Sequence, residues 1–414
     1  MSDNGNDVRV LRDLARQVAD IAAKPVQDER RRLWRDHNSL IRTRPPVICT
    51  GLFFWHEVGL YESLRCRDGL LRQFEERLRL TIWRDRLNDD CIVEPYIVVP
   101  PVYTAPKDDA CRWGPPIRFS ERPMPGGAFA FMPCINDEAD IAKLVAWPHS
   151  IDEAATAANF RKVQDAVGDI LTVVQSRAPL YNGWKADIST DIARLRGLEQ
   201  IMWDMCDRPA WLHRMCAFMR DGIMAQHDAA ETAGDWRLYD GGNQAMIYSR
   251  DLPDPGPEAG PVERRKMWFF CAAQEMAQVS PAMHDEFILQ YQLPIISKFG
   301  LSAYGCCEDL TNKIDMLRKV PNLRRISVTP FADVRRCAEQ IGTDYVFSWR
   351  PSPAEMICNG WNPDRARRVL RAGMEASKGC HVDVTLKDVQ TIAGNYDNLI
   401  EWVKIAREIT EAYA

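Results

Sequence analysis

The chain has 414 residues and a net charge of −5, from 53 Lys and Arg against 58 Asp and Glu. Hydrophobic residues make up 46% and charged residues 27%, which is typical of a folded globular protein and excludes extensive disorder. No block of like charge is long enough to follow a phosphate backbone, so we expect no nucleic-acid partner. The polar N-terminus and the lack of any run of about 18 apolar residues predict a cytoplasmic protein with no membrane partner.

The 13 cysteines are odd in number and scattered through apolar segments. This distribution favours reduced thiols over a disulfide framework. Most of these cysteines are expected to be small core residues.

The N-terminal segment has a helical period. Apolar residues recur from Val8 to Ile21, Pro25 interrupts the pattern, and a charged helix then continues to about His37. We therefore predict an N-terminal helical extension over residues 1–44 and one main domain over residues 45–414.

Short apolar runs alternate with helical patterns in the first part of this domain. The runs predicted as strands are 47–54, 91–99, 170–175 and 237–239. The patterns predicted as helices are 69–85, 151–168, 195–208, 209–227, 263–277 and 281–299. Glu94 lies among apolar neighbours and is either paired or catalytic. Asn243 lies in the loop after the fourth run and is a candidate substrate-binding residue.

Residues 100–148 are rich in proline and glycine. Insertions of this kind either cover a substrate pocket or pack as plain loops. For residues 100–148 the sequence is compatible with a substrate cover and with a packing loop.

After Gly300 the strand-then-helix rhythm becomes regular. The predicted strands are 301–306, 324–329, 345–349 and 381–386, and the predicted helices are 310–319, 331–341, 363–377 and 396–412. Such short connections imply parallel strands with right-handed crossovers. With about four earlier strands they predict an α/β fold, a (β/α)8 TIM barrel. An open doubly wound sheet is the alternative, although no glycine-rich dinucleotide fingerprint is present.

Cysteines mark two of these strands. Cys306, Cys307 and Glu308 follow strand 301–306, at the rim where barrels keep their chemistry, whereas Cys380 and His381 begin the last strand. Thiolate, carboxylate and imidazole are zinc ligands, so these five residues are candidate metal ligands. Buried structural thiols are the alternative, and the start of a strand faces the opposite end unless residues 378–381 reach over the mouth.

Charged residues close the last two strands. Lys387 and Asp388 are candidate catalytic residues, with a structural ion pair as the alternative. Arg350 is a candidate for gripping an anionic substrate. The chain has no GxSxG, GxxxxGK or HExxH motif, so the corresponding hydrolase, kinase and protease mechanisms are not predicted.

Several segments resemble the uroporphyrinogen decarboxylase superfamily, and within it the methyltransferase-like branch. The segments are YGCCEDL, PNLRRISVTPFADV, DYVFSWRPSPA, GCHVDVTLKD and NLIEWVKIAREI. The resemblance runs from about Pro45 onward and implies a barrel of eight strand-helix units with its pocket at the C-terminal rim.

The resemblance also implies a metal site. Zinc-binding members of the superfamily use an HxC pair and a distant cysteine. In this chain Cys306 lies where the cysteine of the pair is expected, and Cys380 lies where the distant cysteine is expected. Tyr304 stands where the histidine would be, and we assign it to substrate binding. Cys307, Glu308 and His381 then remain as substitute ligands.

Two family segments are absent. The arginine-bearing MRQAGRY-like segment of the decarboxylases is replaced by TGLFFWHEVGLYE, which argues against porphyrinogen decarboxylation. A DxHxxG corrinoid-binding segment is also missing, so any corrinoid would come on a separate partner protein.

We therefore expect a zinc-dependent methyltransferase that moves a methyl group from a small substrate to a corrinoid protein or a thiol. The alternatives are a metal-independent lyase or decarboxylase of an anionic small molecule, and a non-catalytic ligand-binding barrel. The expected partners are the methyl donor, a corrinoid protein and a second copy of the chain in a homodimer.

Overall fold

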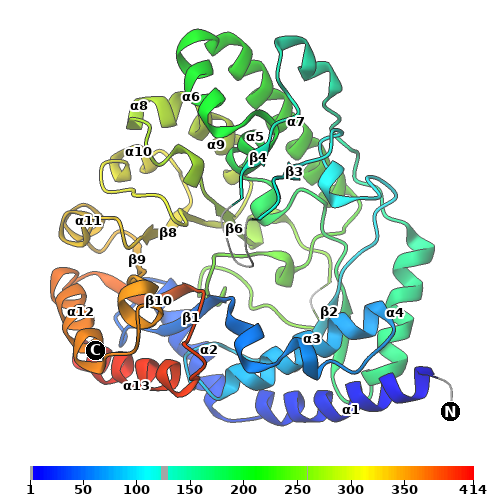
Figure 1. Cartoon of the computed structure of the whole chain (residues 1–414), viewed down its shortest axis with the longest axis vertical. Coiled ribbons are helices and arrows are strands. Elements are labelled where there is room, and N and C mark those ends of the chain that lie inside the picture. The colour runs from blue at the N-terminus through cyan, green and yellow to red at the C-terminus, as the bar shows by residue number, and fades with distance from the viewer. Residues whose placement is uncertain (1–2, 123–128, 259) are drawn as a thin grey trace.

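The chain folds around a curled sheet of six parallel strands (Figure 1). The computed structural model describes residues 3–122, 129–258 and 260–414. Neighbouring strands pair in the order β1-β10-β9-β8-β7-β6, and every pair is parallel. The strands are β1 Val47–Leu52, β6 Trp268–Cys271, β7 Leu301–Tyr304, β8 Leu323–Val328, β9 Val346–Trp349 and β10 His381–Val389.

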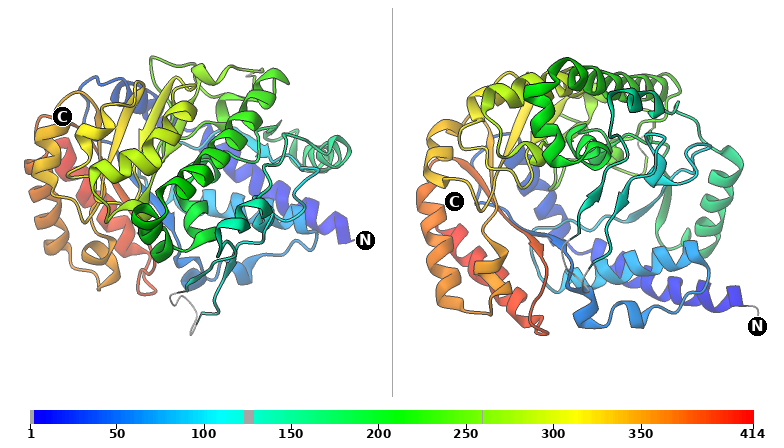
Figure 2. Two further views of the ribbon diagram at one scale, coloured as in Figure 1. Left: turned by 90° about the horizontal axis from the view of Figure 1, so that it is seen from above. Right: turned by 45° about the horizontal axis from the view of Figure 1, so that its top comes forward.

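Two further parallel strands pair only with each other in the described residues. They are β2 Tyr96–Val99 and β5 Thr172–Gln175. No described ladder joins this pair to the six-stranded sheet. The expected closed eight-stranded barrel is thus met in part, by a mixed α/β fold whose six-stranded sheet forms a half-barrel (Figure 2).

Helices cover the outside of the curled sheet. They are α7 Pro209–Thr232, α8 Pro281–His284, α9 Gln290–Ile296, α10 Ile314–Leu317, α11 Val334–Ile341, α12 Pro363–Ala376 and α13 Asp397–Glu411. Asp333 and Asn362 cap α11 and α12 by accepting backbone N–H groups of the first turn. In the described part of the chain no helix is long and apolar enough to cross a bilayer.

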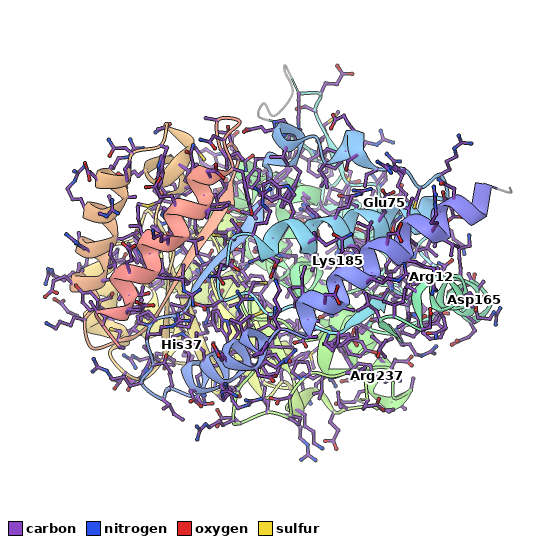
Figure 3. The ribbon with its side chains drawn as sticks, turned by 90° about the horizontal axis from the view of Figure 1, so that it is seen from below. Arg12, His37, Glu75, Asp165, Lys185 and Arg237 are labelled. Carbon is purple, nitrogen blue, oxygen red and sulfur yellow. The ribbon has the colours of Figure 1, made fainter. Side chains whose placement is uncertain are left out.

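The N-terminal helices are α1 Asp3–Ala22 and α2 Val26–Asn38, so the predicted break before Pro25 is confirmed. α1 lies along α3 Gly69–Asp85, as Figure 3 shows, and also contacts α4 Glu153–Val167. A separate apolar cluster fills this region, with Leu11, Phe74 and Val163 among its members.

α2 also reaches the inside of the half-barrel. His37, labelled in Figure 3, places Nε2 3.3 Å from Oδ2 of the buried Asp383 in β10. Arg325 of β8 makes an ion pair with the same carboxylate at 2.8 Å, and the hydroxyl groups of Ser348 and Thr385 donate to its other oxygen. A satisfied polar network therefore fills this part of the interior, which removes the cost of burying the charges unpaired.

Two predicted elements are wrong, and a third is shorter than expected. Residues 263–277, expected as a helix, contain β6. Residues 237–239, expected as a strand, belong to the 3-10 turn Leu238–Asp240. Of the run 91–99 only Tyr96–Val99 is a strand, because Pro95 has no N–H to donate to a ladder. The run from Met267 to Ala273 is apolar at every position, and such a run does not distinguish a buried strand from a buried helix.

One helix was missed, and one was cut short. α5 Ser189–Arg196 was not predicted. α6 Leu198–Asp207 follows it directly and is shorter than the predicted helix 195–208.

In the Pro- and Gly-rich segment 100–148 the described residues form 3-10 turns and the hairpin β3 Arg118–Phe119 with β4 Phe131–Met132. Residues 123–128 of that segment lie outside the described residues. None of its described residues lines the pocket at the rim of the sheet.

Candidate functional site

A pocket of about 430 Å³ opens at the C-terminal ends of β7 to β10. Each of the four strands supplies part of its lining. The lining residues are Cys306 and Cys307 after β7, Pro330 and Phe331 after β8, Arg350 to Glu355 after β9, and Lys387 and Asp388 in β10. Binding sites of parallel α/β sheets are built at this edge, so the pocket is the candidate functional site.

The turn after β7 fixes the two cysteines. Gly305 has φ +96°, and a Cβ there would come within 2.6 Å of Leu310, so only glycine fits. The carboxylate of Glu308 accepts the backbone N–H groups of Cys306, at 2.7 Å, and Ala273, at 2.9 Å. Glu308 therefore holds the loop in place, and each of its oxygens already accepts a backbone N–H group.

The two thiols meet a lysine. Cys306 Sγ lies 3.4 Å from Cys307 Sγ, and Lys387 Nζ donates to Cys306 Sγ at 2.9 Å and to Cys307 Sγ at 3.5 Å. Lys387 also forms an ion pair with Asp388 at 2.9 Å. Cys306 is buried, whereas Cys307 is exposed. We call Cys306, Cys307, Lys387 and Asp388 the thiol–lysine cluster.

The cluster favours a thiolate at Cys306. A hydrogen bond from the Cys307 thiol lowers the pKa of Cys306 to about 6, and the charges of Arg350 and Lys387 act in the same direction against the opposing effect of burial. The same bond raises the pKa of Cys307, which therefore stays protonated. Burial lowers the pKa of Lys387, but the Cys306 sulfur and Asp388 raise it and the net shift is upward, so the ammonium form is kept. The result is a thiolate–ammonium pair facing the pocket.

A close approach between β1 and β10 positions Asp388. Asp388 has φ +61° and Gly51 has φ +58°. A Cβ on Gly51 would lie 2.5 Å from Asp388 Oδ1, so the contact requires glycine. Non-glycine residues with positive φ are uncommon and concentrate at functional sites, which agrees with the placement of Asp388 in this pocket.

Arg350 forms the inner wall of the pocket. Its guanidinium is buried and donates to the Cys306 carbonyl oxygen and to Gln244 Oε1, both at 2.5 Å. Its Nε has no acceptor among the described residues. A buried cation with a spare donor suits an anionic ligand group, as the sequence suggested.

The loop that carries Asn243 does reach the site, but through the next residue. Asn243 is buried and bonds within its own loop, with Met246 O and Ala245 N. Gln244 has φ +62° and accepts from Arg350 instead. No sequence signal separates these two neighbouring amides, because only the backbone conformation decides which one faces the arginine.

Two other candidates lie outside the pocket lining. The hydroxyl group of Tyr304 bonds to His284 Nε2 and Gln292 Oε1, both at 2.8 Å, in the buried interface with the helices. Glu94 accepts from Arg31 at 2.9 Å and from Tyr248 at 2.5 Å. These contacts support the interpretation of Glu94 as a paired carboxylate. Neither Tyr304 nor Glu94 contacts the thiol–lysine cluster.

Cys380 and His381 lie at the other end of β10. Lys387 lies seven positions after Cys380 along an extended strand, a span of roughly 23 Å at about 3.3 Å per residue. Both residues line a different cavity of about 470 Å³, and the Cys380 thiol faces the Ala338 carbonyl oxygen at 3.6 Å. Burial raises its pKa to about 11. The expected pairing of Cys306 with Cys380 around one ion is therefore not formed.

The remaining donors do not fit the expected zinc site. Zinc needs about four ligands, of which at least three come from the protein. Glu308 is already bonded to two backbone N–H groups, and the Cys306 and Cys307 sulfurs accept from an ammonium. In the described residues no group of three or more His, Cys, Asp or Glu side chains is arranged to hold a metal. These residues therefore do not fit a zinc ion.

Comparisons with known proteins give a likeness of fold. A methyltransferase from Methanosarcina mazei superposes with a TM-score of 0.53 at 12% identity, covering 93% of this chain and 98% of that chain. No family model and no curated protein sequence matches. At this identity the similarity concerns the path of the backbone, and it extends over nearly the whole of both chains.

Proposed function

We propose that the protein is a methyltransferase that takes a methyl group from a small anionic donor bound in the rim pocket. The observation that carries the proposal is the thiolate–ammonium pair of Cys306 and Lys387 inside that pocket. A methyl carbon bound to a heteroatom is a soft electrophile, and a thiolate is the matching nucleophile.

The surrounding charges suit such a donor. Arg350 lines the pocket and would attract the donor's anionic group, which would help to position the methyl carbon near the sulfur. The heteroatom–methyl bond breaks as the Cys306 sulfur–carbon bond forms. Lys387 passes a proton to the departing heteroatom. A second nucleophile then attacks the methyl carbon, the Cys306 sulfur leaves as the thiolate, and Lys387 takes a proton back from a thiol acceptor or from water.

The likeness in fold to the M. mazei methyltransferase supports this reading, as do the segments that resemble the uroporphyrinogen decarboxylase superfamily. Membership of that superfamily is part of the proposal. A small thiol and a corrinoid carried by a partner protein are the two acceptors to be compared.

Mass spectrometry tests the proposal in a single turnover. The tryptic peptide of residues 299–313 contains both Cys306 and Cys307. Incubation with a panel of N-, O- and S-methylated carboxylates should add the mass of one CH2 group to this peptide, at Cys306. Adding a small thiol or a reduced cobalamin should then remove the label and yield methylated acceptor.

Three variants sharpen the assay. Cys306→Ser should abolish the label, and Arg350→Met should reduce it at least tenfold at low donor concentration, since a charged hydrogen bond contributes about 1.5–3 kcal/mol. Cys380→Ser, at the opposite end of β10, should behave as wild type. Methyl transfer that persists in Cys306→Ser would remove the thiolate from the mechanism.

A metal-independent lyase or decarboxylase of an anionic substrate is the second candidate. The ion pair of Lys387 and Asp388 beside Arg350 favours it, because these charges suit carboxylate binding and proton transfer. Release of CO2 from the same carboxylate panel, with full activity in Cys306→Ser, would select this reading over methyl transfer.

A further inference from the structure

The adjacent cysteines of the rim pocket differ in exposure and in hydrogen bonding. Cys306 is buried and receives a hydrogen bond from Lys387 at 2.9 Å. Cys307 is exposed, and its sulfur lies only 3.4 Å from that of Cys306. An ammonium-stabilised sulfur is thus paired with a second thiol that solvent reaches freely.

We propose that Cys306 and Cys307 form an oxidation site at which a hydroperoxide converts the two thiols into a disulfide. This inference goes beyond methyl transfer and does not depend on it. Thiolates held by a cation react fastest with peroxides, and a neighbouring thiol resolves the product.

The chemistry balances with groups that are present. The Cys306 thiolate attacks the outer peroxide oxygen, the O–O bond breaks, and the leaving oxygen takes a proton from Lys387, which leaves Cys306 as a sulfenic acid. The Cys307 thiol gives its proton to the neutral Lys387 amine, 3.5 Å away, and the resulting thiolate attacks the sulfenic sulfur. The hydroxyl group leaves and takes a proton from Lys387, so that water departs. The sulfur pair loses two electrons, and the peroxide gains them.

The disulfide would be strained and therefore easily reduced. Successive Cα atoms lie about 3.8 Å apart, whereas disulfide-bonded residues usually have Cα atoms about 4.4–6.8 Å apart. Strain of this kind makes a disulfide more reducible, so a small dithiol should restore the two thiols. The site would then alternate between the dithiol and disulfide forms as the peroxide concentration falls and rises.

Oxidation would also change the pocket. Lys387 would lose its thiolate acceptor and keep Asp388, at 2.9 Å, as its partner. The Cys306 sulfur would no longer be nucleophilic. Any chemistry that needs the thiolate would stop until reduction.

Peptide mass spectrometry tests the proposal without an activity assay. Treatment of the whole chain with hydrogen peroxide near one equivalent should make the 299–313 peptide lose the mass of two hydrogen atoms, and dithiothreitol should reverse the loss. In Cys307→Ser the product should stop at a sulfenic acid on Cys306 that dimedone traps. Lys387→Met should slow the first step about tenfold at pH 7.

Two other cysteines serve as internal controls. Cys206 is exposed and Cys380 is half-buried at the opposite end of β10. The proposal is overturned if the 299–313 peptide is oxidised no faster than these thiols, or if Cys307→Ser gives no dimedone adduct while circular dichroism shows a wild-type fold.

Discussion

The buried Arg350 and the thiol–lysine cluster show how individual residues acquire a role from their neighbours. Cys306 and Cys307 are chemically identical and adjacent, yet Cys306 is buried with its sulfur 2.9 Å from the Lys387 ammonium, whereas Cys307 is exposed and 3.5 Å from it. In the hydrogen bond between the two sulfurs, Cys306 is the acceptor and Cys307 is the donor. Neither the residue types nor their spacing predict this division.

The donor role of Cys307 can be measured. Because the Cys307 thiol lowers the pKa of Cys306 to about 6, alkylation of Cys306 by iodoacetamide should rise with pH around a midpoint near 6. Cys307→Ala removes the donor, so the midpoint should move toward the ordinary thiol value of about 8.5, and alkylation at pH 7 should slow about tenfold. Peptide mass spectrometry from pH 5 to 9 gives the profile.

Cys307→Ser is the matched variant, because its hydroxyl group keeps a donor in the same place. Its midpoint should stay closer to that of the wild type than to that of Cys307→Ala. Identical profiles for the two variants would show that the bond between the neighbouring side chains does not set the acidity of Cys306.

The pairing of β1 with β10 is the element that positions Asp388. Gly51→Ala would place a methyl group 2.5 Å from Asp388 Oδ1 and also strain a residue with φ +58°. We expect a loss of more than about 1 kcal/mol in the free energy of unfolding, together with displacement of Asp388. Urea unfolding measures the first effect, and the peroxide reactivity of Cys306 reports the second.

Gly59→Ala is the control variant that separates backbone strain at a positive φ from the contact with Asp388. Gly59 has φ +64°, but its nearest neighbour would lie 3.9 Å from an added Cβ, so this variant carries the strain alone. A change in Cys306 reactivity with Gly51→Ala but not with Gly59→Ala is the expected result. Equal changes would show that the Asp388 contact does not matter.

At the level of elements, the strand-helix units after residue 300 were predictable, because each apolar run is bounded by turn residues and followed by a helical period. The expected strand 324–329 and helix 331–341 correspond to β8 and α11, for example. β6 was not predictable, because an all-apolar run lacks a period. The rim position of Cys306 and Lys387 followed from strand ends. Joining Cys306 to Cys380 required residues 378–381 to reach over the mouth, and instead β10 begins at His381, at the opposite end of the strand.

At the scale of the whole molecule, buried histidines add a contribution to stability that acid removes. Burial lowers the pKa of His227 to about 4 and that of His284 to about 3. Their ordinary value is about 6.5, so at these two positions the unfolded chain binds protons first as the pH falls. Their contribution to the free energy of unfolding is therefore complete above about pH 6.5 and decreases toward pH 4 and below, by on the order of 3 kcal/mol for His227 alone.

Urea unfolding between pH 4 and 8 checks this expectation. His227→Gln should flatten the pH dependence by removing one of these groups, although the variant starts from lower stability because it loses packing against Trp236. His56→Gln, at an exposed position, is the control for the substitution itself. A wild-type stability that stays constant from pH 7 to 4 would contradict the assignment.

The register of β1 with β10 has a consequence for biosynthesis. Val47 pairs with Val384, and no other described strand pairs with β1. During translation the first strand of the sheet therefore has no pairing partner until the last strand has been synthesised. Its backbone N–H and C=O groups stay unpaired while more than three hundred residues are added. Ribosome-bound chains that end before residue 381 should accordingly be protease-sensitive around residues 47–52 and should depend on chaperones.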